Sequence, residues 1–232
     1  MTLRFKALPL WGQSIFAILI GMLGAFAQAP FGLVPLILVM MALGFLILSV
    51  TLSARNAAYF GFLIGFGYFL VTLHWITSPF QVDAEQHAWM APFALLFMAS
   101  GMALFWSLAF GAARFLGPIW TLVLTWPLVE LLRAYVFTGF PWASPPQALV
   151  DVVVGQGLAW VGPHGMMLGL SLLALLSFKS LTSSKITQFC VGMTLLLLTV
   201  FPTPRSDAEF TTHTIRLVQP NAAQKDKWNP DK

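Results

Sequence analysis

The sequence is poor in charge and in cysteine. Only 9% of its 232 residues are Asp, Glu, Lys or Arg, whereas 58% are hydrophobic, with 21 Phe and 9 Trp among them. Because soluble domains carry about 25% charged residues, this composition excludes a soluble globular fold. The abundance of apolar residues also excludes an intrinsically disordered chain. The single cysteine, Cys190, excludes an intrachain disulfide framework and any multi-cysteine metal site.

Long stretches without charge divide the chain into segments of membrane-spanning length. No charged residue occurs between Lys6 and Arg55, and four more such gaps follow before Arg205. A helix crosses a bilayer with about 20 apolar residues, and turn-forming residues at 28–35 split the first gap in two. We therefore predict an all-α polytopic membrane protein whose membrane domain is residues 1–203. The seven expected spans are about 10–28, 34–53, 56–77, 89–113, 116–136, 162–179 and 186–202.

The positive charges indicate one orientation. With a cytoplasmic amino terminus, the cytoplasmic segments hold six Lys or Arg and no acidic residue, and the opposite segments hold four acidic residues and one Arg. Lys and Arg concentrate on the cytoplasmic side of membrane proteins. We therefore expect this orientation and, after an odd number of spans, an external tail beyond residue 203. The six cytoplasmic charges are Arg4, Lys6, Arg55, Arg114, Lys179 and Lys185.

The first thirty residues also have the features of a cleavable secretory signal. The charges of the later segments alternate between the two sides of the membrane, and this pattern fits the expected number of spans only if the first span is present. We therefore expect the first span to be retained. The formal net charge of +4 comes from scattered Lys and Arg rather than from a basic stripe. It therefore reflects membrane topology, and no nucleic-acid partner is expected.

Two ionisable residues fall inside the fifth expected span. Glu130 lies about 24 Å beyond Arg114 along a helix, near the outer edge of an apolar layer about 30 Å thick. Arg133, three residues later, shares its helical face. Charges at this depth are costly and are usually paired or functional. Two interpretations stay open: a structural pair that ties the span to a neighbour, or part of a substrate site.

Aromatic residues gather at the same outer level. His74 and Trp75 come at the end of the third expected span, and Phe140, Pro141 and Trp142 follow the fifth. They form either a belt at the membrane interface or a portal for a lipid chain or substrate. Composition alone does not separate these two readings.

The composition changes at residue 205. Residues 205–209 are polar, and residues 214–219 alternate as a β-strand does. Because an isolated strand is not independently stable, we expect residues 204–232 to begin a soluble domain. Cys190 lies about 7 Å into the membrane from Lys185, on the cytoplasmic side, where a buried apolar thiol is inert.

Several motifs occur in an order that resembles one family. The most specific is Glu130-Leu-Leu-Arg133 followed by Thr138-Gly139-Phe140-Pro141-Trp142. The series resembles the membrane portion of the bacterial apolipoprotein N-acyltransferases, and its last strand is similar to the first strand of their nitrilase-like domain. The other members are Phe31-Gly32, Leu73-His74-Trp75-Ile76, residues 215–219 and Trp228.

The resemblance implies an enzyme of the bacterial inner membrane that needs no cofactor. It would move an acyl chain from a phospholipid to the free α-amino group of the diacylglyceryl-cysteine of an apolipoprotein, at the periplasmic leaflet. In this family a Cys thiolate carries the acyl group as a thioester, a Glu acts as base and a Lys stabilises the oxyanion, which suits acyl transfer. Trp228 matches a family tryptophan near the active-site entrance.

The sequence ends before the three catalytic positions of that family, so we assign no catalytic role to Glu130, Cys190, Lys225 or Lys227. We expect the 232-residue chain to be a fragment without transferase activity of its own, whose outer aromatic face serves as a platform and lipid entrance. Two alternatives stay open: a small transporter or channel, and a non-catalytic membrane scaffold. Transporters typically contain internal repeats, and we find none in this sequence.

Overall fold

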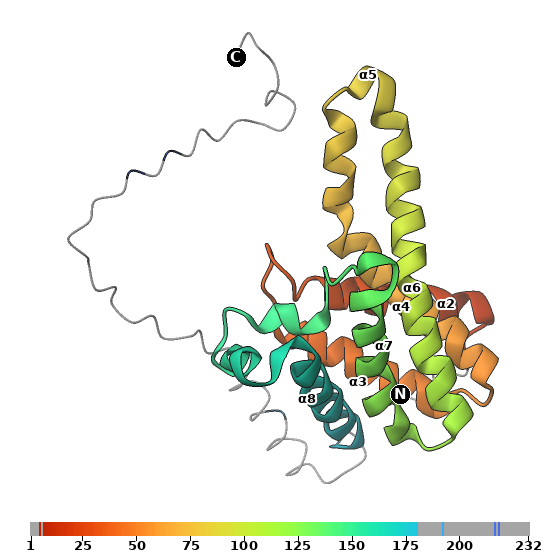
Figure 1. The fold of residues 1–232 in the computed structure, drawn as a ribbon. Helices are drawn as coiled ribbons and strands as arrows, with labels where there is room; N and C mark the ends of the chain where they lie inside the picture. Colours follow the sequence, from red (N-terminus) through yellow and green to blue (C-terminus); the bar gives the residue numbers. More distant parts are fainter. Residues whose placement is uncertain (1–4, 6, 181–191, 193–215, 217, 219–232) are drawn as a thin grey trace.

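The computed structural model describes residues 5, 7–180, 192, 216 and 218 (Figure 1). In these residues the all-α class predicted from the sequence is confirmed. The helices are α2 (Leu10–Ala25), α3 (Pro35–Val50), α4 (Ala54–Thr72), α5 (Ala84–His87), α6 (Ala91–Leu116), α7 (Leu122–Tyr135) and α8 (Leu158–Ser180). Short 3-10 helices join them: η1 (His74–Gln81), η2 (Ala88–Met90), η3 (Ile119–Thr121), η4 (Val136–Thr138), η5 (Pro145–Leu149) and η6 (Val153–Gly157).

Six of the helices contact one another in a closed cycle. Helix α4 packs on α2 and on α6, α6 on α7, α7 on α8, α8 on α3, and α3 on α2. Large aromatic side chains fill the space between α4, α6 and α7: Tyr68, Phe69, Trp106, Phe110 and Trp126 are all fully buried. The Trp126 ring meets Trp106 at 4.9 Å and Phe110 at 5.1 Å between centroids, both edge to face. This arrangement is favourable for aromatic pairs.

Two glycines let α2 and α4 approach closely. A Cβ at Gly21 would meet the backbone of Ile64, and a Cβ at Gly67 would meet the backbone of Ile18. Small residues at a helix crossing allow such backbone contact, which is the usual way that helices associate in a membrane. The close packing of α2 against α4 therefore depends on these two glycines, whose lack of a side chain leaves room for the opposing backbone.

A hairpin projects from the bundle between α4 and α6. Helix α4 ends at Thr72, and η1 leaves it at an angle of 44°. The 3-10 helix η1 and the first turns of α6 extend away from the other helices, with α5 at the tip (Figure 1). His74 and Trp75 therefore lie beyond a bend, in η1, and do not continue the straight end of a third span.

Two helical segments, Ala84–Leu116 and Val153–Ser180, are long and apolar enough to cross a membrane, and α4 with η1 makes a third if the bent pair is one span. Helices α2 and α3 are apolar but have only 16 residues each. Large apolar side chains face outward, among them Phe97, Phe115 and Trp160, as expected for a surface in lipid. The described residues thus form a helical membrane protein.

The number of seven spans stays a prediction. Helix α7, in the fifth expected span, has 14 residues because the chain turns at Gly117, with a φ of 102°, and at Pro118 before it begins. Of the seventh expected span, 186–202, only residue 192 is described, and of residues 204–232 only 216 and 218. Cys190 and Trp228 therefore lie outside the described residues. Of the expected strand, only residues 216 and 218 are described.

Candidate functional site

The centre of the site is an ion pair on α7. Glu130 and Arg133 lie three residues apart, so the helix places both on one face. Nη2 of Arg133 donates to Oε2 of Glu130 at 2.7 Å, and Nε donates to Oε1 at 3.3 Å. Both side chains are only 1% exposed. The pair is therefore bidentate and fully removed from solvent.

The Glu130 carboxylate has two further donors from other segments. Nε1 of Trp106 in α6 donates to Oε1 at 2.8 Å, and Oγ of Ser144 donates to Oε2 at 3.1 Å. A buried ion pair is tolerable only when its remaining hydrogen-bonding capacity is satisfied. Here each carboxylate oxygen receives two hydrogen bonds, so the charge is compensated from α6, α7 and the segment after α7.

The Arg133 guanidinium holds the segment that follows α7. Its Nη1 donates to the carbonyl oxygens of Phe140, at 2.6 Å, and Trp142, at 2.9 Å. Its carbon lies 5.2 Å from the centre of the Phe69 ring, a cation–π distance. A lysine could not replace it, because one ammonium does not reproduce a planar fork that serves several acceptors at once.

The backbone between α7 and η5 adopts a conformation that needs this support. Thr138, Gly139 and Ala143 have φ values of 70°, 86° and 58°. Left-handed residues other than glycine cost about 1–3 kcal/mol and persist where their surroundings fix them. At Gly139 a Cβ would also meet the carbonyl oxygen of Ala134. The two Arg133 hydrogen bonds therefore hold a loop that is not intrinsically favourable.

A circuit of four hydrogen bonds and one ring stack connects the ion pair to the turn after α2. Nε2 of Gln28 donates to the Tyr68 hydroxyl at 2.7 Å and to the Ser144 carbonyl oxygen at 3.1 Å. The Tyr68 ring stacks on Trp106 with 5.0 Å between centroids. Because Trp106 and Ser144 both donate to Glu130, these five residues form a closed path of contacts. The turn after α2, α4, α6, α7 and the loop before η5 are thereby tied together.

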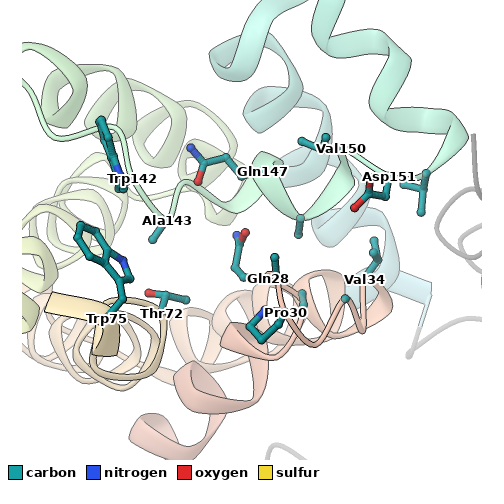
Figure 2. Close-up of a pocket in the computed structure, with 15 residues that line it drawn as sticks. Gln28, Pro30, Val34, Thr72, Trp75, Trp142, Ala143, Gln147, Val150 and Asp151 are labelled. Carbon is teal, nitrogen blue, oxygen red and sulfur yellow. The ribbon is translucent and has the colours of Figure 1, made fainter. Parts of the chain in front are cut away.

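A pocket of about 520 Å³ opens beside this circuit. The turn after α2 forms one wall, the end of α4 with η1 another, and the segment from Trp142 to Val152 the third (Figure 2). Gln28 lines it from the middle, while Trp75 and Trp142 stand at one end and Asp151 at the other (Figure 2). Glu130 and Arg133 do not line it. The ion pair thus supports the wall that carries Trp142 and does not touch the pocket.

The aromatic and neighbouring residues singled out from the sequence either line the pocket, lie near it without lining it, or fall outside the described residues. Trp75 and Trp142 line the pocket, whereas His74 does not and is exposed, its Nδ1 2.9 Å from the Val71 carbonyl oxygen. Phe140 stacks on Trp142 at 5.8 Å, and the Pro141 carbonyl oxygen accepts from Gln147 at 3.2 Å. Trp228 lies outside the described residues.

Sequence reasoning missed Gln28, Tyr68, Trp106 and Ser144. Gln28 carries a signal that could have marked it, since it is a polar residue in an apolar stretch and precedes a turn. The others carry none, because a tyrosine, a tryptophan or a serine in an apolar helix or loop is common. Among residues 7–180 and the few described beyond them, no three His, Cys, Asp or Glu side chains gather where a metal ion could bind.

Fold and site together define an α-helical membrane domain with a pocket whose Trp142 wall is held by a buried ion pair. Residues 20–177 match the family model of the apolipoprotein N-acyltransferase N-terminal domain, and the chain belongs to that family.

Curated relatives support this assignment. The chain is 36% identical over 174 residues to the apolipoprotein N-acyltransferase of Caulobacter vibrioides, which covers 68% of this chain and 33% of the relative. It is 34% identical over 191 residues to that of Brucella suis biovar 1, covering 75% and 35%. An alignment of 256 residues with that of Rhizobium etli, at 30% identity, covers 97% of this chain and 47% of the relative. The chain thus spans between a third and a half of these relatives' length.

Proposed function

We propose that the chain forms the membrane domain of an acyltransferase of bacterial lipoprotein maturation. The acyl chain would pass from a phospholipid to the α-amino group of the diacylglyceryl-cysteine of an apolipoprotein, through a Cys thioester and without a cofactor. The relatives are named for N-acyl transfer to apolipoproteins, and the family model covers most of the described bundle. We assign residues 1–203, with seven spans, to the inner membrane, and residues 204–232 to the start of a periplasmic nitrilase-like domain.

One structural observation supports a role in substrate entry for the described residues. The buried Arg133 binds the carbonyl oxygens of Phe140 and Trp142, and Trp142 forms a wall of the pocket together with Trp75. A pocket of about 520 Å³ lies within the range of about 300–1,000 Å³ typical of small-molecule sites. We therefore assign the aromatic outer face to substrate entry, with the ion pair as the support that keeps it in shape.

The charged residues support the proposed orientation. Arg114, near the end of α6, donates from Nε to the carbonyl oxygen of Leu52, just before α4, at 3.4 Å. Arg55 lies in the first turn of α4, so these two arginines lie at the same end of the bundle. Asp83 and Glu85 lie at the tip of the projecting hairpin, beyond the opposite end of α4 (Figure 1). With positive charge on the cytoplasmic side, the pocket and the hairpin face the periplasm.

A chimera tests the function. The segment of the Caulobacter vibrioides relative that aligns with this chain is replaced by the matching residues of this chain, and the product is purified from membranes. We expect it to convert a diacylglyceryl lipopeptide to the N-acylated form in the presence of phospholipid, as measured by mass spectrometry. The parent enzyme is the positive control. A chimera that is folded, as judged by its melting temperature, but gives no N-acylated lipopeptide would contradict the proposal.

A further inference from the structure

Two arginines lie where the end of α6 packs on the start of α4. Nε of Arg114, in the last turn of α6, donates to the carbonyl oxygen of Leu52, just before α4, at 3.4 Å. A Cβ at Gly111, three residues earlier, would lie 3.6 Å from the carbonyl oxygen of Ala54. The last turn of α6 is therefore in direct contact with the first turn of α4, which contains Arg55.

Both arginine side chains keep hydrogen-bond donors outside this contact. Arg55 is exposed, and Arg114 is partly exposed. Arg55 comes about two and a half turns before Ile64, whose backbone meets α2 at Gly21, so it lies on the face of α4 away from α2. Among the described residues, Arg114 has one hydrogen-bond partner, which Nε serves, and both of its Nη groups remain available. The α4–α6 pair thus carries two guanidinium groups at one end.

No carboxylate of the described residues neutralises this charge. Neither arginine forms an ion pair with any residue that the structure describes. The described carboxylates lie at the hairpin tip, in the buried ion pair and in the pocket, and they belong to Asp83, Glu85, Glu130 and Asp151. Like charges at one end of a bundle repel each other. An anion from outside the protein would therefore stabilise this end.

The residues that flank the two arginines are apolar and face outward. Leu52 is 80% exposed and Phe115 is 83% exposed, and Trp120 in η3 is also more than half exposed. The 19 residues of α4 rise about 28 Å, close to the thickness of about 30 Å of the hydrocarbon layer. Arg55 therefore lies at the level of the lipid phosphates when α4 spans the membrane. An anion that reaches this surface is one carried by a lipid, because a dissolved anion would have to leave water for apolar surroundings.

We propose that Arg55 and Arg114 bind the phosphodiester group of an anionic glycerophospholipid. A guanidinium can donate two parallel hydrogen bonds to a phosphate, and basic sites between transmembrane helices bind anionic headgroups. The acyl chains of the lipid lie against the exposed apolar residues at the end of α6. A zwitterionic lipid binds more weakly, because its own ammonium group offsets the charge of its phosphate. The site is at the opposite end of α4 from the pocket, and the inference does not depend on the proposed acyl transfer.

Native mass spectrometry of the full 232-residue chain in neutral detergent tests the preference for an anionic lipid. The probes are dioleoyl phosphatidylglycerol and dioleoyl phosphatidylcholine, each titrated separately. We expect the first phosphatidylglycerol to bind at least about tenfold more tightly than the first phosphatidylcholine, because each basic residue near an anionic headgroup contributes about fivefold. The preference should shrink as ammonium acetate is added, because salt screens exposed charges. Equal affinity for the two lipids would overturn the proposal.

Matched variants locate the binding. Arg55→Gln and Arg114→Gln should each lower the preference by about fivefold, and the double variant should bind the two lipids within about twofold of each other. Arg114→Lys should keep part of the preference, because it retains the charge but not the planar fork. Lys179→Gln removes a positive charge from the end of α8, which packs on α3 and α7, and should change nothing. If the double variant prefers phosphatidylglycerol as strongly as Lys179→Gln does, the arginines are not the site.

The melting temperature of each variant without lipid separates binding from folding. Arg55→Gln removes no contact with the described residues, so it still reports binding if Arg114→Gln destabilises the junction with Leu52. Competition identifies the source of the phosphate. Sodium phosphate should displace an acyl-labelled phosphatidylglycerol no better than sodium chloride of the same ionic strength, because it has no acyl chains. Stronger displacement by phosphate than by chloride would make the ligand a dissolved phosphate and overturn its assignment to a lipid.

Discussion

Arg133 and Phe140 are joined through the backbone of Phe140. Nη1 of the arginine donates to the Phe140 carbonyl oxygen at 2.6 Å, and the Phe140 amide donates to the Arg133 carbonyl oxygen at 3.1 Å. The side chain and the main chain of Arg133 thus both bind Phe140, seven residues further along the chain, and close the intervening loop on itself. The same guanidinium binds Glu130, so the shape of the loop depends on a charge inside the bundle.

Replacing Arg133 tests this dependence. Arg133→Leu leaves the Glu130 carboxylate buried without its ion-pair partner, a change that typically costs about 3–5 kcal/mol. We expect a large fall in the melting temperature of the chain in detergent. The double variant Glu130→Leu with Arg133→Leu should melt higher than the single variant, because no unpaired charge remains. A single variant that melts like the unmodified chain would mean that the pair is not desolvated as the structure has it.

Part of this arrangement follows from local sequence. Charge-free stretches predict helices, and a spacing of three residues predicts that Glu130 and Arg133 share a face. The bond from Gln28 to Ser144 joins residues 116 apart, and no local periodicity encodes it. The bend after Thr72 is also hidden, because apolar residues continue past it and resemble the end of a longer span. Local pattern thus predicted the helices, whereas the pocket depends on how distant turns meet.

The second prediction concerns the two hydrogen bonds that Gln28 donates. Gln28→Leu leaves the Tyr68 hydroxyl and the Ser144 carbonyl oxygen buried with a lost partner each, at a cost of about 1–3 kcal/mol. We expect a lower melting temperature. Adding Tyr68→Phe to Gln28→Leu removes the stranded hydroxyl, so the double variant should lose less than the sum of the two single variants. Strict additivity would argue that the two side chains do not interact.

Two glycines, Gly67 in α4 and Gly101 in α6, provide a matched pair of variants that tests helix packing. Gly67→Ala places a methyl group against the Ile18 backbone, whereas at Gly101 in α6 a Cβ meets no atom within 4 Å. Overpacking typically costs about 1–3 kcal/mol, and alanine is a better helix former than glycine. We expect Gly67→Ala to lower the melting temperature and Gly101→Ala to leave it unchanged or higher. Equal effects would show that α2 and α4 are not in close backbone contact.

The last prediction concerns orientation. Asn56 is exposed near the start of α4, beside Arg55, and Gln86 is exposed at the tip of the hairpin. In a Cys190→Ser background, each position receives a single cysteine, and intact cells are treated with a thiol reagent that does not cross the inner membrane. The cysteine at position 86 should be labelled, and the one at position 56 should be labelled only after the membrane is opened.

The two positions control for each other, because both side chains are exposed in the structure and only the side of the membrane differs. The expected pattern follows from the arginines that lie at the Asn56 end and the acidic residues that lie at the Gln86 end, since Lys and Arg concentrate on the cytoplasmic side. It would place the pocket, which adjoins the base of the hairpin through Trp75, on the periplasmic side. Labelling at position 56 but not at position 86 in intact cells would reverse the orientation and put the pocket on the cytoplasmic face.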